Sequence, residues 1–290
     1  MLKLRRLVAL LGVFALSDVA ASAQPKPPTP IPSGAVLDAA GFRVGMSEDE
    51  LREQLGKSGY SEKDTPPDPR LQKSQWTQGG ERIINNHKET RFVSALQAAK
   101  DGKGDSVVNK SWGEHIAAMF LGPANEHRVW ALQRTVDYSP DMSPTLKDAM
   151  AGLQAKYGVP TLSNKASGNI FWGWDRSGRL LSGGAGGKAC ETLMQQIASP
   201  ILNRAPQWDA PTYIANQVIQ SVQPFTPQTV LQCPYGAFAQ IFTDRQSGLV
   251  TRVKVVVGSG FMADEGASRT GAYVGALDKA VQAAKPKPNY

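Results

Sequence analysis

The sequence predicts an α+β protein whose antiparallel sheet carries helices packed on one face. Two pairs of apolar segments have the spacing of β-hairpins: residues 115–121 with 128–138, and residues 237–243 with 249–257. Helical patterns come in separate blocks and do not follow every strand, as they would in a parallel α/β sheet. These observations favour antiparallel strands with the helices added as separate blocks.

The first helix is expected in the stretch GFRVGMSEDELREQLGKSGY, residues 41–60. Ser47 and Glu50 have the spacing of a capping box, and acidic residues fill the first turn, where the helix dipole favours them. Leu51 and Leu55 then recur at helical spacing. Every part of this stretch therefore has a role in folding, and none of it requires a catalytic explanation.

A second helix is expected after Met142, with Ser143 as its N-cap and Pro144 at its first helical position. Met46 and Ser47 precede the first helix in the same way, and both helices end near a glycine and a tyrosine. This similarity indicates a possible weak duplication of a helix-plus-sheet module.

The segment 128–138 alternates in the manner of a strand with one buried face. Trp130, Leu132, Val136 and Tyr138 share that face. The residues that alternate with them are expected to face solvent: Ala131, Gln133, Thr135 and Asp137.

The sequence specifies the pairing of the first hairpin, and the elements in the second half of the chain, less strongly. A hairpin that turns at residues 122–125 would place His115 opposite Leu132. A last helix is expected over residues 267–284, and residues 182–234 have no assigned structure.

The ends of the chain predict export. Residues 1–23 combine basic residues, an apolar run and small residues, as a secretory signal peptide does, and the apolar run of about ten residues is half of the roughly 20 that span a membrane. Residues 24–34 contain five prolines and predict an extended linker. An N-terminal module over residues 35–105 and a C-terminal module over residues 106–290 are expected to follow. The prediction is a periplasmic or secreted protein with no transmembrane segment after signal removal.

The two cysteines of the chain, Cys190 and Cys233, are expected to form a disulfide in an oxidising compartment. Closing so long a loop would stabilise the fold by about 4 kcal/mol in the loop-entropy model. The alternative is two buried free thiols. The role is structural in either case, because no Cys-x-x-Cys spacing marks a redox pair.

Residues 41–60 also carry a resemblance. The order of a short strand, Gly-Phe-Arg-Val-Gly-Met-Ser and an acidic helix closing on Leu-Gly resembles the helix entrance of the outer-membrane assembly lipoprotein BamE (SmpA) and of the β-lactamase inhibitor protein. It also resembles a broad set of exported proteobacterial proteins. The resemblance covers about twenty residues and implies an α+β module used for protein contacts, with Gly45 and Met46 serving the turn and the core. The chain departs from the lipoprotein in lacking its lipid-bearing cysteine, and it is much longer than either relative.

Neither a metal site nor a cofactor site is predicted. The glycine-rich residues 182–188 depart from a phosphate-binding loop at both ends, because Ser182 replaces the first glycine and Ala189 follows Lys188 where a Ser or Thr is needed. The chain has three histidines, which are interpreted as surface or half-buried residues. Its formal charge is +7, and the basic residues are scattered, so no nucleic-acid partner is predicted.

The most suggestive surface candidate is the aromatic strand expected at residues 169–175. Trp172 and Trp174 point to the same face, and Trp130 on another strand is a possible third anchor. Half-exposed indoles give a large contact area, so these three residues are the predicted binding residues. The alternative places them in the core.

The functional prediction follows from the lack of a recognisable catalytic constellation and from the resemblance. We expect a non-catalytic binding or protein-interaction module of the bacterial envelope, whose partner is another envelope or extracellular protein. The alternative is a periplasmic or secreted hydrolase whose site has no sequence signature.

Overall fold

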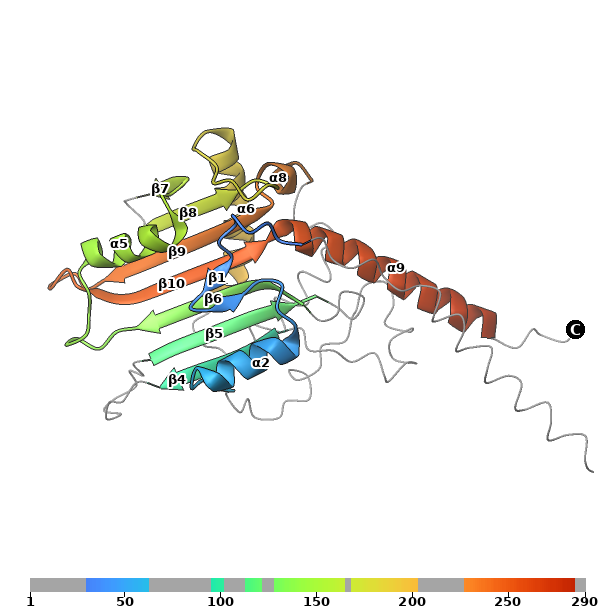
Figure 1. The fold of residues 1–290 in the computed structure, drawn as a ribbon, viewed down its shortest axis with the longest axis horizontal. Coiled ribbons are helices and arrows are strands. Elements are labelled where there is room, and N and C mark those ends of the chain that lie inside the picture. The colour runs from blue at the N-terminus through green and yellow to red at the C-terminus, as the bar shows by residue number, and fades with distance from the viewer. Residues whose placement is uncertain are drawn as a thin grey trace, which may run out of the picture.

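The computed structural model describes residues 30–62, 95–101, 113–121, 128–164, 168–202 and 227–284. These residues form an eight-stranded sheet and a two-stranded sheet, both antiparallel, together with five helices (Figure 1). The predicted α+β architecture with antiparallel sheets is confirmed. The predicted signal peptide, residues 1–23, and residues 24–29 of the predicted linker lie outside the described residues.

The first half of the large sheet follows a small hairpin and one helix. The elements, in chain order, are β1 (Asp38–Ala39), β2 (Phe42–Arg43), α2 (Glu48–Lys57), β3 (Ser61–Glu62), β4 (Ala95–Asp101), β5 (Gly113–Phe120) and β6 (Val129–Asp137). At the start of α2, the Glu50 N–H donates to Ser47 Oγ at 3.2 Å, and the Ser47 N–H donates to the Glu50 carboxylate at 2.7 Å. The predicted capping box is therefore confirmed.

The second half also begins with a helix and contains two helices inserted between its strands. Its elements are α5 (Leu146–Tyr157), β7 (Leu162–Asn164), β8 (Asn169–Trp174), α6 (Ala185–Leu202), α8 (Pro227–Gln232), β9 (Tyr235–Thr243), β10 (Val250–Ser259) and α9 (Gly260–Ala284). The segment that the sequence left unassigned thus contributes α6 and α8.

The N-cap of α5 is Thr145, and the prediction of Ser143 was wrong. The Asp148 N–H donates to Thr145 Oγ1 at 3.1 Å, whereas the Ser143 hydroxyl donates to a backbone carbonyl four residues earlier at 2.9 Å. Pro144 stays outside the helix because its carbonyl oxygen accepts a hydrogen bond from Val250 N–H at 2.9 Å. A tertiary contact with β10 therefore delays the start of the helix.

The strand order of the large sheet is β3-β4-β5-β6-β10-β9-β8-β7. Each half consists of a helix followed by four strands that run in sequence from an edge of the sheet to its centre. The last strands of the two halves, β6 and β10, pair there, with Val136 opposite Val253. The two halves therefore share one order of helix and strands. The predicted module boundary at residues 105/106 falls between β4 and β5, which are paired strands of this sheet.

The register of β5 on β6 differs from the predicted one. His115 lies opposite Thr135, not Leu132. The pairing shifts between Met119 and Phe120, where the ladder is irregular. This irregularity shifts the register by one of the three residues that separate Leu132 from Thr135, so it accounts for part of the difference.

Helices cover both faces of the sheet, whereas we expected them on one. Figure 1 shows α2, α5 and the β1–β2 hairpin on the near face and α6 behind the sheet. Within β8, Trp172 packs against Tyr157 of α5 with ring centroids 5.2 Å apart, and its neighbour Gly173 faces Cys190 of α6. Because successive strand residues point to opposite faces, α5 and α6 lie on opposite sides. The second layer exists because α6 and α8 are inserted between β8 and β9.

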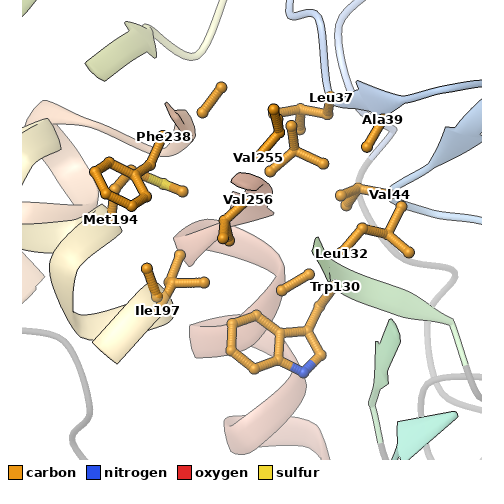
Figure 2. Packing of buried hydrophobic residues seen from close by; sticks show 14 of the residues in the cluster. Leu37, Ala39, Val44, Trp130, Leu132, Met194, Ile197, Phe238, Val255 and Val256 are labelled. Atoms are coloured by element: carbon orange, nitrogen blue, oxygen red, sulfur yellow. The ribbon is translucent and has the colours of Figure 1, made fainter. Parts of the chain in front are cut away.

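Buried apolar residues also lie on both faces of the central strands. Val255 of β10 lies on the side of Leu37, next to the β1–β2 hairpin, and Val256 lies on the side of Ile197 of α6 (Figure 2). Both valines are buried. The central strands are therefore apolar on both faces, as strands between two layers must be.

A row of small residues crosses the sheet under α6. Gly173 of β8 lies opposite Gly236 of β9, which lies opposite Gly258 of β10, which lies opposite Ala131 of β6. A Cβ on these three glycines would meet Cys190 Sγ at 1.9 Å, Met194 Sδ at 2.5 Å and Ile197 Cδ1 at 3.1 Å, respectively. The glycine row thus allows α6 to approach the strand backbones more closely than side chains would permit.

The longest helix, α9, begins directly after β10 and extends away from the sheet (Figure 1). Within the described parts of the chain, no helix combines the length and the apolar character needed to cross a membrane.

Candidate binding site

The three predicted binding residues lie in the hydrophobic core. Trp172, Trp174 and Trp130 are 0%, 2% and 3% exposed. The Trp172 indole N–H donates to the Gly158 carbonyl oxygen at 2.9 Å, so its polar atom is satisfied inside the protein. These indoles present no contact area to a partner. They lie in the core, as the alternative interpretation of the sequence expected.

The predicted disulfide is present. Cys190 of α6 and Cys233, the residue after α8, are joined with their Cα atoms 5.1 Å apart. The bridge lies directly over Gly173 and fixes the two inserted helices to each other and to β8. Its role is therefore structural.

The remaining sequence candidates do not converge on one site. The glycine-rich stretch divides at Ala185, where α6 begins, so residues 185–188 are helical and residues 182–184 form the exposed turn before them. His115 is half-buried on β5, and His87 and His127 lie outside the described residues. Among the residues that the structure describes, no group of three or more His, Cys, Asp or Glu side chains could hold a metal ion.

The feature that the sequence did not predict is a cleft of about 370 Å³ between α5, the β1–β2 turn and the central strands, which we call the central cleft. Its floor is apolar and is formed by Val136 of β6 and by Val253 and Val255 of β10. Ala149 and Leu153 of α5 form one wall. Because β6 closes the first half and β10 the second, the central cleft lies at the junction of the two halves. Its size and lining are typical of a small-ligand site.

The central cleft exists because α5 covers its half of the sheet less completely than α2 covers the other. Leu51 and Leu55 of α2 are buried, whereas Tyr157 is the buried residue of α5. Leu146 is 48% exposed, and Met142, which lines the cleft, is 73% exposed. Large apolar side chains therefore remain exposed at and beside the cleft rim in the described structure.

Open space also lies along the side of α5 that faces the central cleft. Gly152 lines the cleft, and a Cβ placed on it would meet no atom within 4 Å. A side chain at this position could enter the cleft without a clash. Glycine in a helix interior lowers helix stability, so this residue keeps the cleft open at a cost of roughly 0.5–1 kcal/mol relative to alanine.

Arg134 of β6 lines the central cleft and forms an ion pair with Glu114, which does not line the cleft. Its Nη2 lies 2.9 Å from the Glu114 carboxylate, and Nε lies 3.4 Å from the other oxygen of the same group. Glu114 also accepts a hydrogen bond from the Tyr60 hydroxyl. Burial, followed by this contact with Glu114, raises the pKa of Tyr60 to about 12. Burial opposes ionisation of Glu114, but Tyr60 and Arg134 together lower its pKa, so the Arg134–Glu114 pair is charged at neutral pH.

Lys156 of α5 provides a second cation at the central cleft. Its ammonium group pairs with the Asp38 carboxylate of β1, and the Tyr157 hydroxyl donates to the Asp38 carbonyl oxygen at 2.7 Å. Burial, followed by the charge of Asp38, raises the pKa of Tyr157, so this hydroxyl keeps its proton. These contacts tie α5 to the β1–β2 hairpin at one end of the cleft.

Sequence reasoning missed Arg134, although a signal was present. The residue falls between Leu132 and Val136 on the predicted buried face of its strand. A charged side chain on the buried face of a strand needs a partner of opposite charge, and such residues often have a function. The partner, Glu114, could not be identified because the register between the strands was not predictable.

No family model, curated protein or solved structure matches this chain. The interpretation of the central cleft therefore rests on its own residues.

Proposed function

We propose that this chain is an exported, non-catalytic binding module of the bacterial envelope, and that the central cleft receives its partner. The observation that carries the proposal is the incomplete cover of the sheet by α5, which leaves an apolar cleft with Met142 and Leu146 exposed beside it. Exposed apolar side chains around a concave surface are typical of a binding site. Two charged residues of the lining, Arg134 and Lys156, are held in ion pairs with Glu114 and Asp38.

Two further features support the location and the class. The signal-peptide pattern of residues 1–23 and the disulfide fit a periplasmic or secreted protein. The resemblance of residues 41–60 to BamE and the β-lactamase inhibitor protein supports a role in contacts with another envelope or extracellular protein.

Site-specific photo-crosslinking in bacterial cells tests the site. A photoreactive residue is placed at Leu146, beside the cleft, or at Ala151, which is exposed on the same helix but does not line the cleft. We expect crosslinked species from position 146 and none from position 151. Equal crosslinking from the two positions would contradict a binding site at the central cleft.

The location has its own test. N-terminal sequencing of the exported protein is expected to begin at Gln24, because cleavage is predicted after Ala23. A cytosolic protein that retains Met1 would refute export, and its cysteines would then be expected to stay reduced.

A further inference from the structure

We propose that the central cleft binds a ligand in which an apolar chain or ring carries one carboxylate. The apolar part would lie on the valine floor, and the carboxylate would lie against Arg134, which lines the cleft. This inference rests on the proposed function and specifies the chemistry of its site.

The polar lining of the cleft includes two cations, each paired with a carboxylate that does not itself line the cleft. Arg134 and Lys156 line the cleft, whereas Glu114 does not, and Asp38 lines a separate hollow on the N-terminal side of the β1–β2 hairpin. The Glu114 carboxylate bonds to Nε and Nη2 of Arg134. Nη1 of Arg134 takes no part in this ion pair, so its N–H groups can donate to an anion in the cleft.

The charge of Arg134 acts on two tyrosines that line the cleft. Burial raises the pKa of Tyr138 and of Tyr157, and Arg134 opposes the rise in each case, whereas Glu114 adds to it at Tyr138 and Asp38 adds to it at Tyr157. The acidic side chain that lines the cleft, Asp148, is exposed and is engaged with Thr145 at the start of α5.

The remaining lining selects the apolar part of the ligand. Val136, Val253, Val255 and Leu153 provide aliphatic surface without hydrogen-bonding groups. A cleft of about 370 Å³ accommodates one chain or ring, either of a free ligand or of a terminal residue that a partner protein inserts. The two parts of the cleft together fit a molecule with one apolar and one anionic end, such as a fatty acid or the carboxyl-terminal residue of a peptide.

Binding is measured by isothermal titration of the full-length mature protein with decanoate and with decyltrimethylammonium, which has the same tail and the opposite charge. We expect decanoate to bind more tightly by at least about tenfold. The blocking variant is Gly152→Phe, whose new side chain enters the open space of the cleft. The matched control is Ala151→Phe, on the exposed side of the same helix. Gly152→Phe should weaken decanoate binding by at least about tenfold, and Ala151→Phe should leave it unchanged.

Equal binding of the two amphiphiles, or equal decanoate binding by the two variants, would overturn the proposal. If decanoate fails to bind while position 146 still gives crosslinks, the ligand chemistry is wrong and the proposed function stands. If decanoate binds as expected, a peptide that ends in a free leucine carboxylate is compared with its amide. Tighter binding of the peptide acid than of decanoate assigns the carboxylate to a protein terminus, and weaker binding assigns it to a free acid.

Discussion

The contact between the disulfide and the glycine row makes Gly173→Ala a sharp test of the packing. The added methyl group would lie 1.9 Å from Cys190 Sγ and 3.0 Å from Cys233 Sγ. Neither sulfur can move alone, because the bridge joins α6 to the segment after α8. The substitution must therefore displace the helix pair from the sheet or distort β8.

The expected loss of unfolding free energy follows from two opposing effects. Overpacking in a close-packed core costs about 1–3 kcal/mol, and the upper end applies where the neighbour is fixed. Replacing a strand glycine with alanine returns roughly 0.5–1 kcal/mol. We expect a net loss of about 2 kcal/mol, which urea denaturation of the oxidised protein measures.

Two comparisons test whether the contact with the disulfide causes this loss of unfolding free energy. Gly236→Ala, directly opposite in β9, would meet the flexible end of Met194, so its cost should be smaller. Removing the bridge with Cys190→Ala and Cys233→Ala should cost about 4 kcal/mol in the loop-entropy model. In that background, Gly173→Ala should cost less than about 1 kcal/mol, because both sulfur atoms are gone. Equal costs of Gly173→Ala with and without the bridge would refute the explanation.

Three other predictions concern the core, the half-buried ion pair of Glu114 with Arg134, and the helix cap. Trp172→Ala should lower the unfolding free energy by about 3–5 kcal/mol, which thermal and urea denaturation measure, and a loss below about 1 kcal/mol would contradict its place in the core. Glu114→Gln should lower the unfolding free energy at neutral pH, and the variant and the wild type should become equally stable in acid. Because folding lowers the pKa of Glu114, its contribution to stability is present above the ordinary pKa of 4.5 and is lost as the pH falls through the folded-state pKa. A difference that persists at low pH in urea denaturation would exclude this explanation. Thr145→Ala should cost about 1 kcal/mol and Ser143→Ala less, and the reverse order in thermal denaturation would restore Ser143 as the cap.

Local signals predicted much of the fold. The alternation of apolar residues located β6, β9 and β10 to within a few residues, and the capping box located the start of α2. These signals act over a few neighbouring residues, so the sequence displays them directly. The disulfide was predictable for a different reason, since a chain with two cysteines has one possible intramolecular pairing.

Features that depend on the other layers of the fold were not predictable. Alternation showed that Trp172 and Trp174 share a face, but it could not show whether a helix covers that face. The structure covers it, and both indoles are buried. Likewise, Gly186 and Gly187 read as part of a loop because glycine is a weak helix former, although they lie in the first turn of α6.

The central cleft was the least predictable feature. It is formed by α5, the β1–β2 hairpin and two strands that are distant in the sequence. Its existence depends on how far α5 stands from the sheet, and no local pattern encodes that distance. Arg134 was the one available indication, because it interrupts the apolar face of β6.

The position of β10 at the centre of the sheet has a consequence for biosynthesis. Asp137 of β6 pairs with Arg252 of β10, which emerges from the ribosome 115 residues later. Until then the edge of β6 that β10 will occupy has no strand partner. Such an edge is a template for pairing with other chains, and long-range strand pairs form slowly. The newly synthesised chain is therefore most prone to aggregation in the interval before its last strand arrives, and a chaperone would act most effectively on the chain at that stage.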